Sequence, residues 1–381
     1  MQTVSLPFAL TCRTRCCIIR LHDIECDKRH RVFAGQKKMK LGRIAIPGPD
    51  GTVTRIVGVH PEESRVVDLV KAEALRLLGK GATRGAAYRL AHAKFPSSMS
   101  DAIALGDTFL DSAREADSSH GVDASRPFAT VSWQPAADPP VLRDCLTFPV
   151  HINNAMHVVK VKASPFLLHV PGFYKTSPST IIGHEAEVPW PGYTSHMDYE
   201  LELGIVVGRE ARNLTPEQAE EVIFGFTIFN DFSARDVIVT EMPIGLGPTK
   251  SKDFASGIGP WITTMDELGG IRNFNIGELK AVARVNGEVW SVGDTRHMIW
   301  SPAELLAYIS QCDNLRPGDV IGSGTVGNGC TLELPGRRLK PGDLVELEVS
   351  GLGVLRNRLG QPEPAYWWPT KRANPLLPQL S

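Results

Sequence analysis

The chain lacks a long hydrophobic run and lacks an excess of charge of either sign. No apolar stretch in its 381 residues approaches the roughly 18 to 20 that a membrane-spanning helix requires, and the N-terminus lacks the apolar core of a signal peptide. The 41 basic and 42 acidic side chains nearly cancel, so no overall field attracts nucleic acid or an anionic membrane. We therefore expect a soluble cytoplasmic protein that binds neither nucleic acid nor a membrane.

The chain also lacks the cysteine pattern of a disulfide framework, because its seven cysteines are odd in number and unevenly spaced. The first 30 residues hold four of them and two histidines: Cys12, Cys16, Cys17, Cys26, His22 and His30. No pair has the C-x-x-C spacing that marks a zinc site strongly. Reduced thiols are the main interpretation of this group, and a zinc site is the alternative.

The composition, with 42% apolar and 22% charged residues, predicts a folded protein of roughly two domains. We divide the chain into an N-terminal extension over 1–38, a small domain with a helical linker over 39–141, a main domain over 142–360 and a C-terminal tail over 361–381. The extension carries arginines but no acid through Arg20, which resembles a transit peptide and makes a mitochondrial location the alternative. The tail is either free or packs on a partner.

Short strands dominate the predicted secondary structure, with a few helices between them. Residues 40–59 predict a hairpin, and residues 62–113 show helical periodicity. From 142 to about 358 the pattern predicts mostly strands, interrupted by helices that begin after Thr215 and Ser301. Each of these two residues is followed by a proline and, three residues on, by a capping-box partner. The predicted fold class is therefore mixed α/β and rich in β-structure.

Two acidic residues share one face of a predicted strand, and a third follows the end of another predicted strand. Apolar and acidic residues alternate over 197–203 as in a strand, so Glu200 and Glu202 share one face. Their α-carbons would lie roughly 6.5 to 7 Å apart, near enough for both carboxylates to bind one cation. Asp231 follows a continuously apolar strand over 222–229. Taken alone, the two glutamates are also typical of a solvated face, and Asp231 of a turn cap.

Four blocks of sequence, in this order, resemble the fumarylacetoacetate hydrolase superfamily. They are YELEL at 199–203, NDFSARD at 230–236, KSKD at 250–253 leading to GPW at 259–261, and PGD at 317–319 leading to GSGT at 322–325. The resemblance extends from about 149 to 359. It implies a catalytic domain with the mixed β-roll fold of that family, a smaller N-terminal domain, and usually a homodimer.

The resemblance places the metal ligands of the family on Glu200, Glu202 and Asp231. The implied cofactor is Mg²⁺ or Mn²⁺, with Ca²⁺ as a third candidate, because three hard carboxylates without thiolate or imidazole suit these ions. Three buried like charges also need a cation in order to coexist, so we expect the metal to stabilise the site.

The resemblance also implies two catalytic residues. The water-activating histidine of the family falls on His157, and His151 in the same segment is the alternative. Lys250 matches the lysine that stabilises developing negative charge in the family, unless it is only a solvated loop residue. We therefore predict that His157 and Lys250 carry the catalysis.

Three further residues are predicted to bind the substrate, a small 2-oxo acid: Arg235, Thr325 and Lys252. The planar guanidinium of Arg235 binds a carboxylate bidentately, or else pairs with a structural acid. Thr325 donates its hydroxyl from a Gly-rich loop, or else that loop is only a tight turn. Lys252 belongs to the same block as Lys250.

Three departures from the family pattern concern the substrate. Acylpyruvate-type members have a glutamate three residues after the histidine, which counted from His157 is Lys160 here. A glutamine usually follows the Ala-Arg-Asp turn, where this chain has Ile238. Fumarylacetoacetases proper have a fourth carboxylate seven residues before the histidine, where this chain has Val150. Fumarylacetoacetate itself is therefore not the expected substrate.

The predicted function is hydrolysis of a carbon–carbon bond in an acylpyruvate-like 2-oxo or 1,3-dicarbonyl acid, through a metal-stabilised enolate. His157 would deprotonate the attacking water. The same enolate chemistry supports an isomerase, a hydratase or a decarboxylase, and a non-catalytic metal-stabilised binding protein is a further alternative. Product analysis on one acylpyruvate distinguishes these reactions.

Overall fold

The computed structural model describes residues 38–48, 51–160, 162–271, 273–373 and 376. The N-terminal cysteines, with both interpretations of that group, lie outside the described residues. Residues 1–37 of the extension, on which the mitochondrial alternative depends, lie outside them as well. Within the described part of the chain, no helix combines the length and the apolar character needed to cross a bilayer.

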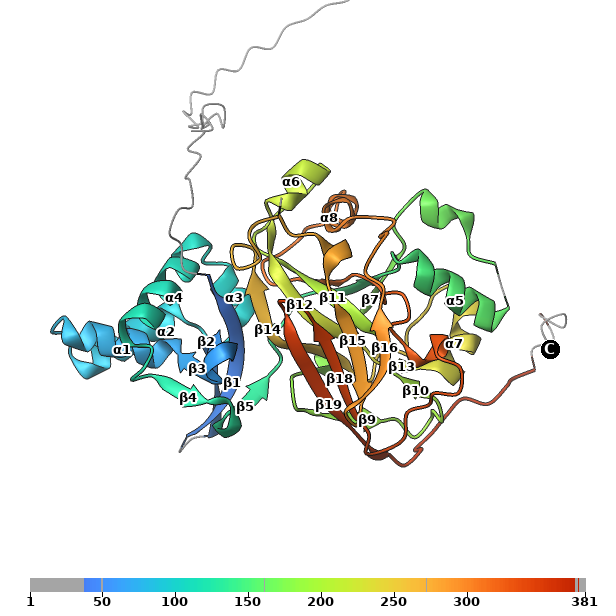
Figure 1. Ribbon diagram of the computed structural model, residues 1–381, viewed down its shortest axis with the longest axis horizontal. Helices are drawn as coiled ribbons and strands as arrows, with labels where there is room; N and C mark the ends of the chain where they lie inside the picture. The colour runs from blue at the N-terminus through green and yellow to red at the C-terminus, as the bar shows by residue number, and fades with distance from the viewer. Residues whose placement is uncertain (1–37, 49–50, 161, 272, 374–375, 377–381) are drawn as a thin grey trace, which may run out of the picture. The chain divides into compact units, whose positions relative to one another are not determined.

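Antiparallel strands and the helices beside them form the first part of the chain (Figure 1). The strands are β1 (Lys40–Gly48), β2 (Gly51–His60) and β3 (Arg65–Asp68), and the helices are α1 (Leu69–Gly79), α2 (Arg84–Lys94), α3 (Met99–Ile103) and α4 (Asp107–His120). β1 and β2 pair antiparallel from Leu41 opposite Gly58 to Gly48 opposite Gly51, which confirms the predicted hairpin. Asp68 caps α1 by accepting a hydrogen bond from the Lys71 amide, so the helix begins directly where β3 ends.

A sheet of 12 strands runs from this part into the rest of the chain, with the main path β4-β3-β2-β1-β14-β12-β11-β17-β6-β7. Its further strands are β4 (Ser125–Pro127), β5 (Ser132–Gln134), β6 (Leu142–Cys145), β7 (Phe173–Thr176), β8 (Ile181–Ile182), β11 (Leu201–Val207), β12 (Ile223–Asp231), β14 (Ser256–Thr264) and β17 (Val320–Gly322). The two parts join where β1 pairs antiparallel with β14, with Leu41 opposite Ile262. Phe109 of α4 shares one core cluster with Phe229 of β12, so the helices of the first part are anchored on the central sheet.

A second sheet packs on the central one and has the order β16-β15-β18-β19-β9. Its strands are β9 (Glu187–Trp190), β15 (Ala281–Val285), β16 (Glu288–Gly293), β18 (Leu344–Val349) and β19 (Gly353–Pro362). Alternate residues of β18, Val345 and Leu347, join a core cluster with Leu203 and Ile205 of β11. These packed sheets confirm the mixed α/β, β-rich fold expected from the sequence.

Short helices and a small strand pair complete the structure. They are α5 (Pro149–Val159), α6 (Pro216–Glu220), α7 (Arg235–Glu241), α8 (Pro302–Ile309), β10 (Met197–Asp198) and β13 (Ser233–Ala234). The 3₁₀ helices are η1 (Pro61–Glu63), η2 (Phe128–Thr130), η3 (Pro165–Leu168), η4 (Pro178–Thr180), η5 (Met242–Ile244), η6 (Ile276–Glu278) and η7 (Thr331–Glu333). α6 and α8 begin as predicted, because Thr215 and Ser301 each form a complete capping box.

The strand predicted over 197–203 is interrupted in the structure. Its first two residues form β10 and pair with β13, and β11 begins only at Leu201, beside β12. Packing covers both faces of β11, so its residues are buried on both sides. Glu200 and Glu202 are therefore buried and do not form a solvated face.

Candidate active site

Four buried carboxylates meet at β11. They belong to Asp144, Glu200, Glu202 and Asp231, and an oxygen of each lies within 4.8 Å of an oxygen of every other one. β11 and the residue before it supply the two glutamates, and β12, which pairs with β11, ends at Asp231. On the other side, β17 pairs with both β11 and β6, and β6 carries Asp144. The order of neighbouring strands explains why these acids converge, and we name them the carboxylate cluster.

The fourth member of the carboxylate cluster, Asp144, is absent from the sequence prediction, whereas the other three are the predicted metal ligands. The family pattern includes an acid seven residues before the histidine. Counted from His157 that position is Val150, but counted from His151 it is Asp144. The signal for the fourth acid was therefore present in the sequence, in the spacing from the alternative histidine.

Burial and crowding change the proton affinity of these carboxylates. Burial, together with repulsion by Asp231, raises the pKa of Asp144 to about 7. Burial and the neighbouring Asp144 raise the pKa of Glu202 well above its ordinary value. Burial also raises the pKa of Asp231 to about 6, against the attraction of Lys252. Glu200 differs, because nearby cations outweigh the effect of burial and lower its pKa to about 2.

Lys252, predicted to bind substrate, lies inside the carboxylate cluster. Its Nζ donates to Glu200 Oε2 and to Asp231 Oδ2, each at 2.5 Å. Burial alone would lower the pKa of Lys252, but these two carboxylates raise it above its ordinary value. The Tyr174 hydroxyl donates to the same Asp231 oxygen at 2.5 Å. Lys252 therefore carries a full positive charge at the centre of the site.

The carboxylate cluster fits a divalent cation. All four groups offer oxygen, the donor that Mg²⁺, Mn²⁺ and Ca²⁺ prefer. Asp231 Oδ1 is buried and, among the described residues, has no hydrogen-bond partner. Lys252 and Arg235 bring two positive charges to four carboxylates, and Arg235 is shared with a fifth acid, Asp198. A divalent cation would supply the positive charge that the protein itself lacks here.

Two other residues predicted to bind substrate already have protein partners. Arg235 Nε donates to Asp198 Oδ2 at 2.8 Å, and Arg235 Nη2 lies 2.8 Å from Glu200 Oε1. This is the structural ion pair that the sequence left open as an alternative. The Thr325 hydroxyl donates to Glu202 Oε1 at 3.3 Å, and the backbone amide before it donates to Oε2 at 3.0 Å. Both residues therefore hold members of the carboxylate cluster in place.

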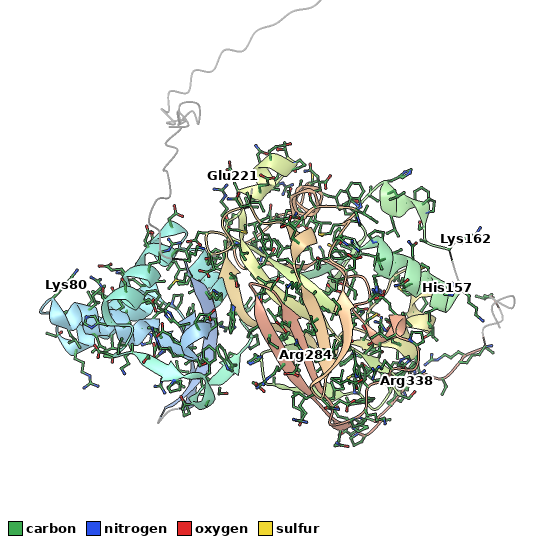
Figure 2. All side chains as sticks on the ribbon, in the orientation of Figure 1. Lys80, His157, Lys162, Glu221, Arg284 and Arg338 are labelled. Carbon is green, nitrogen blue, oxygen red and sulfur yellow. The ribbon has the colours of Figure 1, made fainter. Side chains whose placement is uncertain are left out.

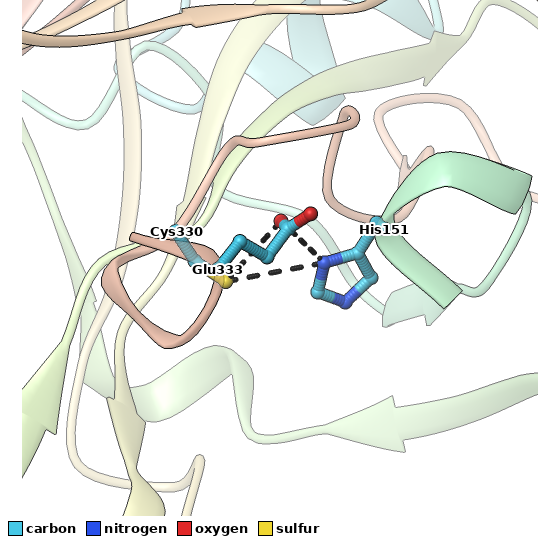
Figure 3. Close-up of side chains that lie close together, drawn as sticks. All are labelled: His151, Cys330 and Glu333. Carbon is cyan, nitrogen blue, oxygen red and sulfur yellow. Dashed lines mark hydrogen bonds and ion pairs between the residues drawn. The ribbon is translucent and has the colours of Figure 1, made fainter. Parts of the chain in front are cut away.

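A second buried group, which we name the His–Cys–Glu cluster, consists of His151, Cys330 and Glu333 (Figure 3). His151 lies in the first turn of α5, and Glu333 ends η7. His151 Nδ1 lies 2.8 Å from Glu333 Oε1. Asp198, which shares an arginine with Glu200, accepts the backbone amide of the residue directly after Cys330 at 2.8 Å. The two clusters are therefore parts of one site.

Hydrogen bonds hold Glu333 in its charged form. Besides His151, it accepts the Asn154 side-chain amide at 2.8 Å and the Asn328 backbone amide at 2.9 Å. Burial would raise the pKa of Glu333, but these bonds outweigh burial and lower it. A charged partner favours the histidine tautomer with hydrogen on Nδ1, which leaves Nε2 free to accept a proton. His151 thus has the arrangement of a general base.

The two predicted catalytic residues lie at the surface. His157 is exposed at the C-terminal end of α5 (Figure 2). Six residues of helix turn through about 600°, so His151 and His157 point about 120° apart and cannot face the same site. Lys250 is exposed too, with its Nζ 6.0 Å from the ring centroid of Tyr193. The structure brings His151 and Lys252, rather than His157 and Lys250, to the carboxylates.

The acid that pairs with the histidine comes from a distant part of the chain. Three residues after His151, where acylpyruvate-type members have a glutamate, this chain has Asn154. Its amide binds Glu333, which lies 182 residues from His151 in the sequence and takes the place of the expected acid. Nothing in the local sequence marks Glu333 as this partner, and only the fold reveals it.

Residues 363–368 of the C-terminal tail pack on the turn at 191–194. Trp368 stacks on Tyr193 with ring centroids 4.6 Å apart, and the Tyr193 hydroxyl donates to the Lys250 carbonyl at 3.0 Å. The tail backbone crosses Gly192 so closely that a Cβ added there would lie 2.2 Å from the Glu363 carbonyl oxygen. The tail therefore supports Tyr193, and Tyr193 in turn holds the backbone two residues before Lys252.

Comparison with known proteins extends these observations. The family model described as fumarylacetoacetate (FAA) hydrolase C-terminal matches residues 146–360. The oxaloacetate tautomerase YisK of Bacillus subtilis is 32% identical over 212 residues, which are 55% of this chain and 67% of that protein. The 4-hydroxyphenylacetate degradation bifunctional isomerase/decarboxylase of Salmonella dublin is 31% identical over 212 residues, 56% of this chain and 46% of that protein. The solved structure of a fumarylacetoacetate hydrolase from Exiguobacterium antarcticum shares the fold, with a TM-score of 0.61 at 24% identity over 84% of this chain and 99% of that one.

Proposed function

The chain belongs to the fumarylacetoacetate hydrolase family, and on that premise we propose that it is a divalent-metal-dependent tautomerase of a small 2-oxo acid. In this reaction a proton moves between the oxygen of the 2-oxo group and the adjacent carbon. The observation that carries the proposal is the His151–Glu333 pair, 2.8 Å apart and next to the carboxylate cluster. The similarity to an oxaloacetate tautomerase supports the same class of substrate and reaction.

The proposed ligands of the cation are the four members of the carboxylate cluster, Asp144, Glu200, Glu202 and Asp231. Mg²⁺ or Mn²⁺ is the proposed ion and Ca²⁺ the third candidate, because all the donors are hard oxygens. When bound, the cation supplies positive charge against the negative charge that develops on the 2-oxo group. Lys252 adds a second positive charge at the same place and so favours the enolate over the neutral ketone.

The proposed base is His151, the alternative to His157 in the sequence analysis. Its Nε2 would take a proton from the carbon next to the carbonyl and return it to the other position of the enolate. Glu333 fixes the ring through Nδ1 and stabilises the imidazolium that forms when Nε2 is protonated. Both side chains are shielded from solvent, so the proton exchanges with the substrate in preference to bulk water.

Hydrolysis of a carbon–carbon bond is the second candidate function. The same histidine–carboxylate pair supports it, because a base that accepts a proton from carbon also accepts one from water. Decarboxylation is a third outcome of the same enolate, and the similarity to an isomerase/decarboxylase favours it as an additional activity. All three candidates use the same residues and differ in which bond of the substrate breaks.

Spectroscopy on two substrates tests the proposal. With Mg²⁺ or Mn²⁺ present, the protein should speed the loss of enol absorbance of freshly dissolved oxaloacetate, at a rate that exceeds any release of CO₂. On an acylpyruvate, proton NMR should show ketonisation of the enol and no free pyruvate. Stoichiometric pyruvate would establish the hydrolase instead, and a rate equal to that of buffer on both substrates would reject enolate chemistry.

The proposed partners are a small 2-oxo acid and a second copy of this chain, as the family resemblance implies. Neither nucleic acid nor a membrane is proposed, given the near-zero net charge of −1. Light scattering after size exclusion should give twice the monomer mass of 41.6 kDa. The division into a small domain over 39–141 and a catalytic domain over 142–360 also stays a proposal.

A further inference from the structure

The His–Cys–Glu cluster contains a donor that the proposed reaction does not use, the thiol of Cys330. This side chain is fully buried, and its Sγ lies 3.9 Å from His151 Nδ1 and 3.5 Å from Glu333 Oε1. Nitrogen, sulfur and oxygen donors thus face a common point from three side chains (Figure 3). We infer that this cluster is a second metal site, selective for a thiophilic cation such as Zn²⁺, and that its occupation inhibits the enzyme.

The distances suit a tetrahedral zinc site. Zinc lies about 2.0 to 2.2 Å from histidine nitrogen or carboxylate oxygen and about 2.3 Å from cysteine sulfur, which separates the ligand atoms by about 3.3 to 3.6 Å. The observed separations of 2.8, 3.5 and 3.9 Å bracket this range. Side-chain movements of about half an ångström would therefore complete the geometry. Three protein ligands leave the fourth position open for water or substrate.

The charge of the His–Cys–Glu cluster also matches the charge of Zn²⁺. Neutral His151 contributes none, whereas the Cys330 thiolate and the Glu333 carboxylate contribute two negative charges. Zn²⁺ would make this buried group neutral, which avoids the cost of an unpaired charge away from water. The thiol proton leaves to solvent when the metal binds.

The two neighbouring clusters differ in the cation that they select. The carboxylate cluster offers only oxygen, which suits Mg²⁺ or Mn²⁺, whereas thiolate and imidazole favour zinc. Zinc at the His–Cys–Glu cluster would therefore bind beside the catalytic cation and not simply replace it.

Inhibition follows from the nitrogen that zinc would use. A neutral imidazole that coordinates through Nδ1 carries its hydrogen on Nε2, so His151 loses the acceptor that the proposed base requires. Zinc would also occupy the Glu333 oxygen that fixes the ring. This consequence rests on the proposed function, whereas the metal site itself does not.

Cobalt is the direct probe of the site, because Co²⁺ bound to thiolate gives an intense near-ultraviolet charge-transfer band. The experiment uses the full chain with Cys12, Cys16, Cys17 and Cys26 changed to Ser, so that those thiols do not contribute, and with excess Mg²⁺ to fill the carboxylate cluster. We expect one Co²⁺ per chain, a thiolate band, and displacement of the band by Zn²⁺. Cys330→Ser should abolish the band, and Cys312→Ser, which changes an exposed thiol, should retain it.

No band, or a band of equal intensity in Cys330→Ser, would overturn the site. Cys330→Ala provides a second thiol-free variant in case a buried serine hydroxyl unfolds the protein, and circular dichroism checks the fold of each.

The same samples give the rate of enol conversion. Saturating Zn²⁺ should lower it roughly 10²-fold or more in the parent, the usual share of a general base, whereas Cys330→Ser should keep its own zinc-free rate.

The two readouts separate the inference from the proposed function. A cobalt band that depends on Cys330, in a protein with no turnover on any 2-oxo acid, would keep the metal site and reject the proposed function. Normal turnover that is insensitive to zinc despite a Cys330-dependent band would overturn the inhibition.

Discussion

The carboxylate cluster and the His–Cys–Glu cluster lie next to each other, yet the chain assembles them differently. Glu200 and Glu202 are neighbours on one strand, and the adjacent strand β12 ends at Asp231. His151 and Glu333 are 182 residues apart and meet only because α5 and η7 pack together. Strand periodicity can mark the first cluster, whereas the second depends wholly on tertiary packing. The contrast explains why the sequence marks members of the carboxylate cluster but gives no sign that His151 pairs with Glu333.

The largest effect on turnover is expected when the carboxylate cluster can no longer bind a metal. Glu202→Gln replaces a buried carboxylate with a neutral amide of the same size, so metal-dependent turnover should fall to background. Circular dichroism should show an unchanged fold, because β11 keeps its backbone pairing. Glu210→Gln, which changes an exposed glutamate, is the matched control. Full turnover in Glu202→Gln would show that the ligand assignment is wrong.

The second prediction compares the two histidines of α5. His151→Ala should lower turnover by roughly 10²- to 10⁴-fold, the usual contribution of a general base, with metal binding intact. His157→Ala should stay close to the parent, because its exposed ring points about 120° away. Steady-state kinetics and metal titration of both variants provide the measurement. The reverse outcome would restore His157 as the base.

Metal removal gives the third prediction. The proposed site would bind a cation only when the chain is folded, so a free metal concentration of 100 times Kd should add about 2.7 kcal/mol to the free energy of unfolding. Melting curves in EDTA should shift to higher temperature when Mg²⁺ or Mn²⁺ is added in excess. Asp231→Asn should lose most of this response. Identical curves with and without metal in the parent protein would contradict a metal site.

The smallest effect concerns the tail that braces the carboxylate cluster. Stacked aromatic pairs contribute about 0.5 to 1.5 kcal/mol, so Trp368→Ala should lower kcat/KM by no more than about tenfold, by loosening the turn before Lys252. Trp368→Phe should recover most of the loss because it keeps the stack. Trp367→Ala removes the neighbouring exposed indole, 75% accessible, and serves as the control. Equal effects of Trp367→Ala and Trp368→Ala would argue against bracing.

Much of the fold followed from local patterns. The hairpin over 40–59 and the helices after Thr215 and Ser301 form where the sequence places them, because turn residues and capping boxes act within a few positions. The expected strand over 197–203 failed in its continuity. The residues before Tyr199 pair with β13, whereas the residues after Glu200 pair with β12, so the segment forms two strands. The segment's own sequence does not indicate either partner strand.

The sequence by itself determined which residue types stand at which strand positions, and through the family resemblance it marked Glu200, Glu202 and Asp231 as one group. Tertiary structure alone decided that these acids are buried, and that His151 and Lys252 lie beside them while His157 and Lys250 face solvent. The physical reason is that periodicity acts over neighbouring residues, whereas burial and charge pairing depend on groups brought together from across the chain.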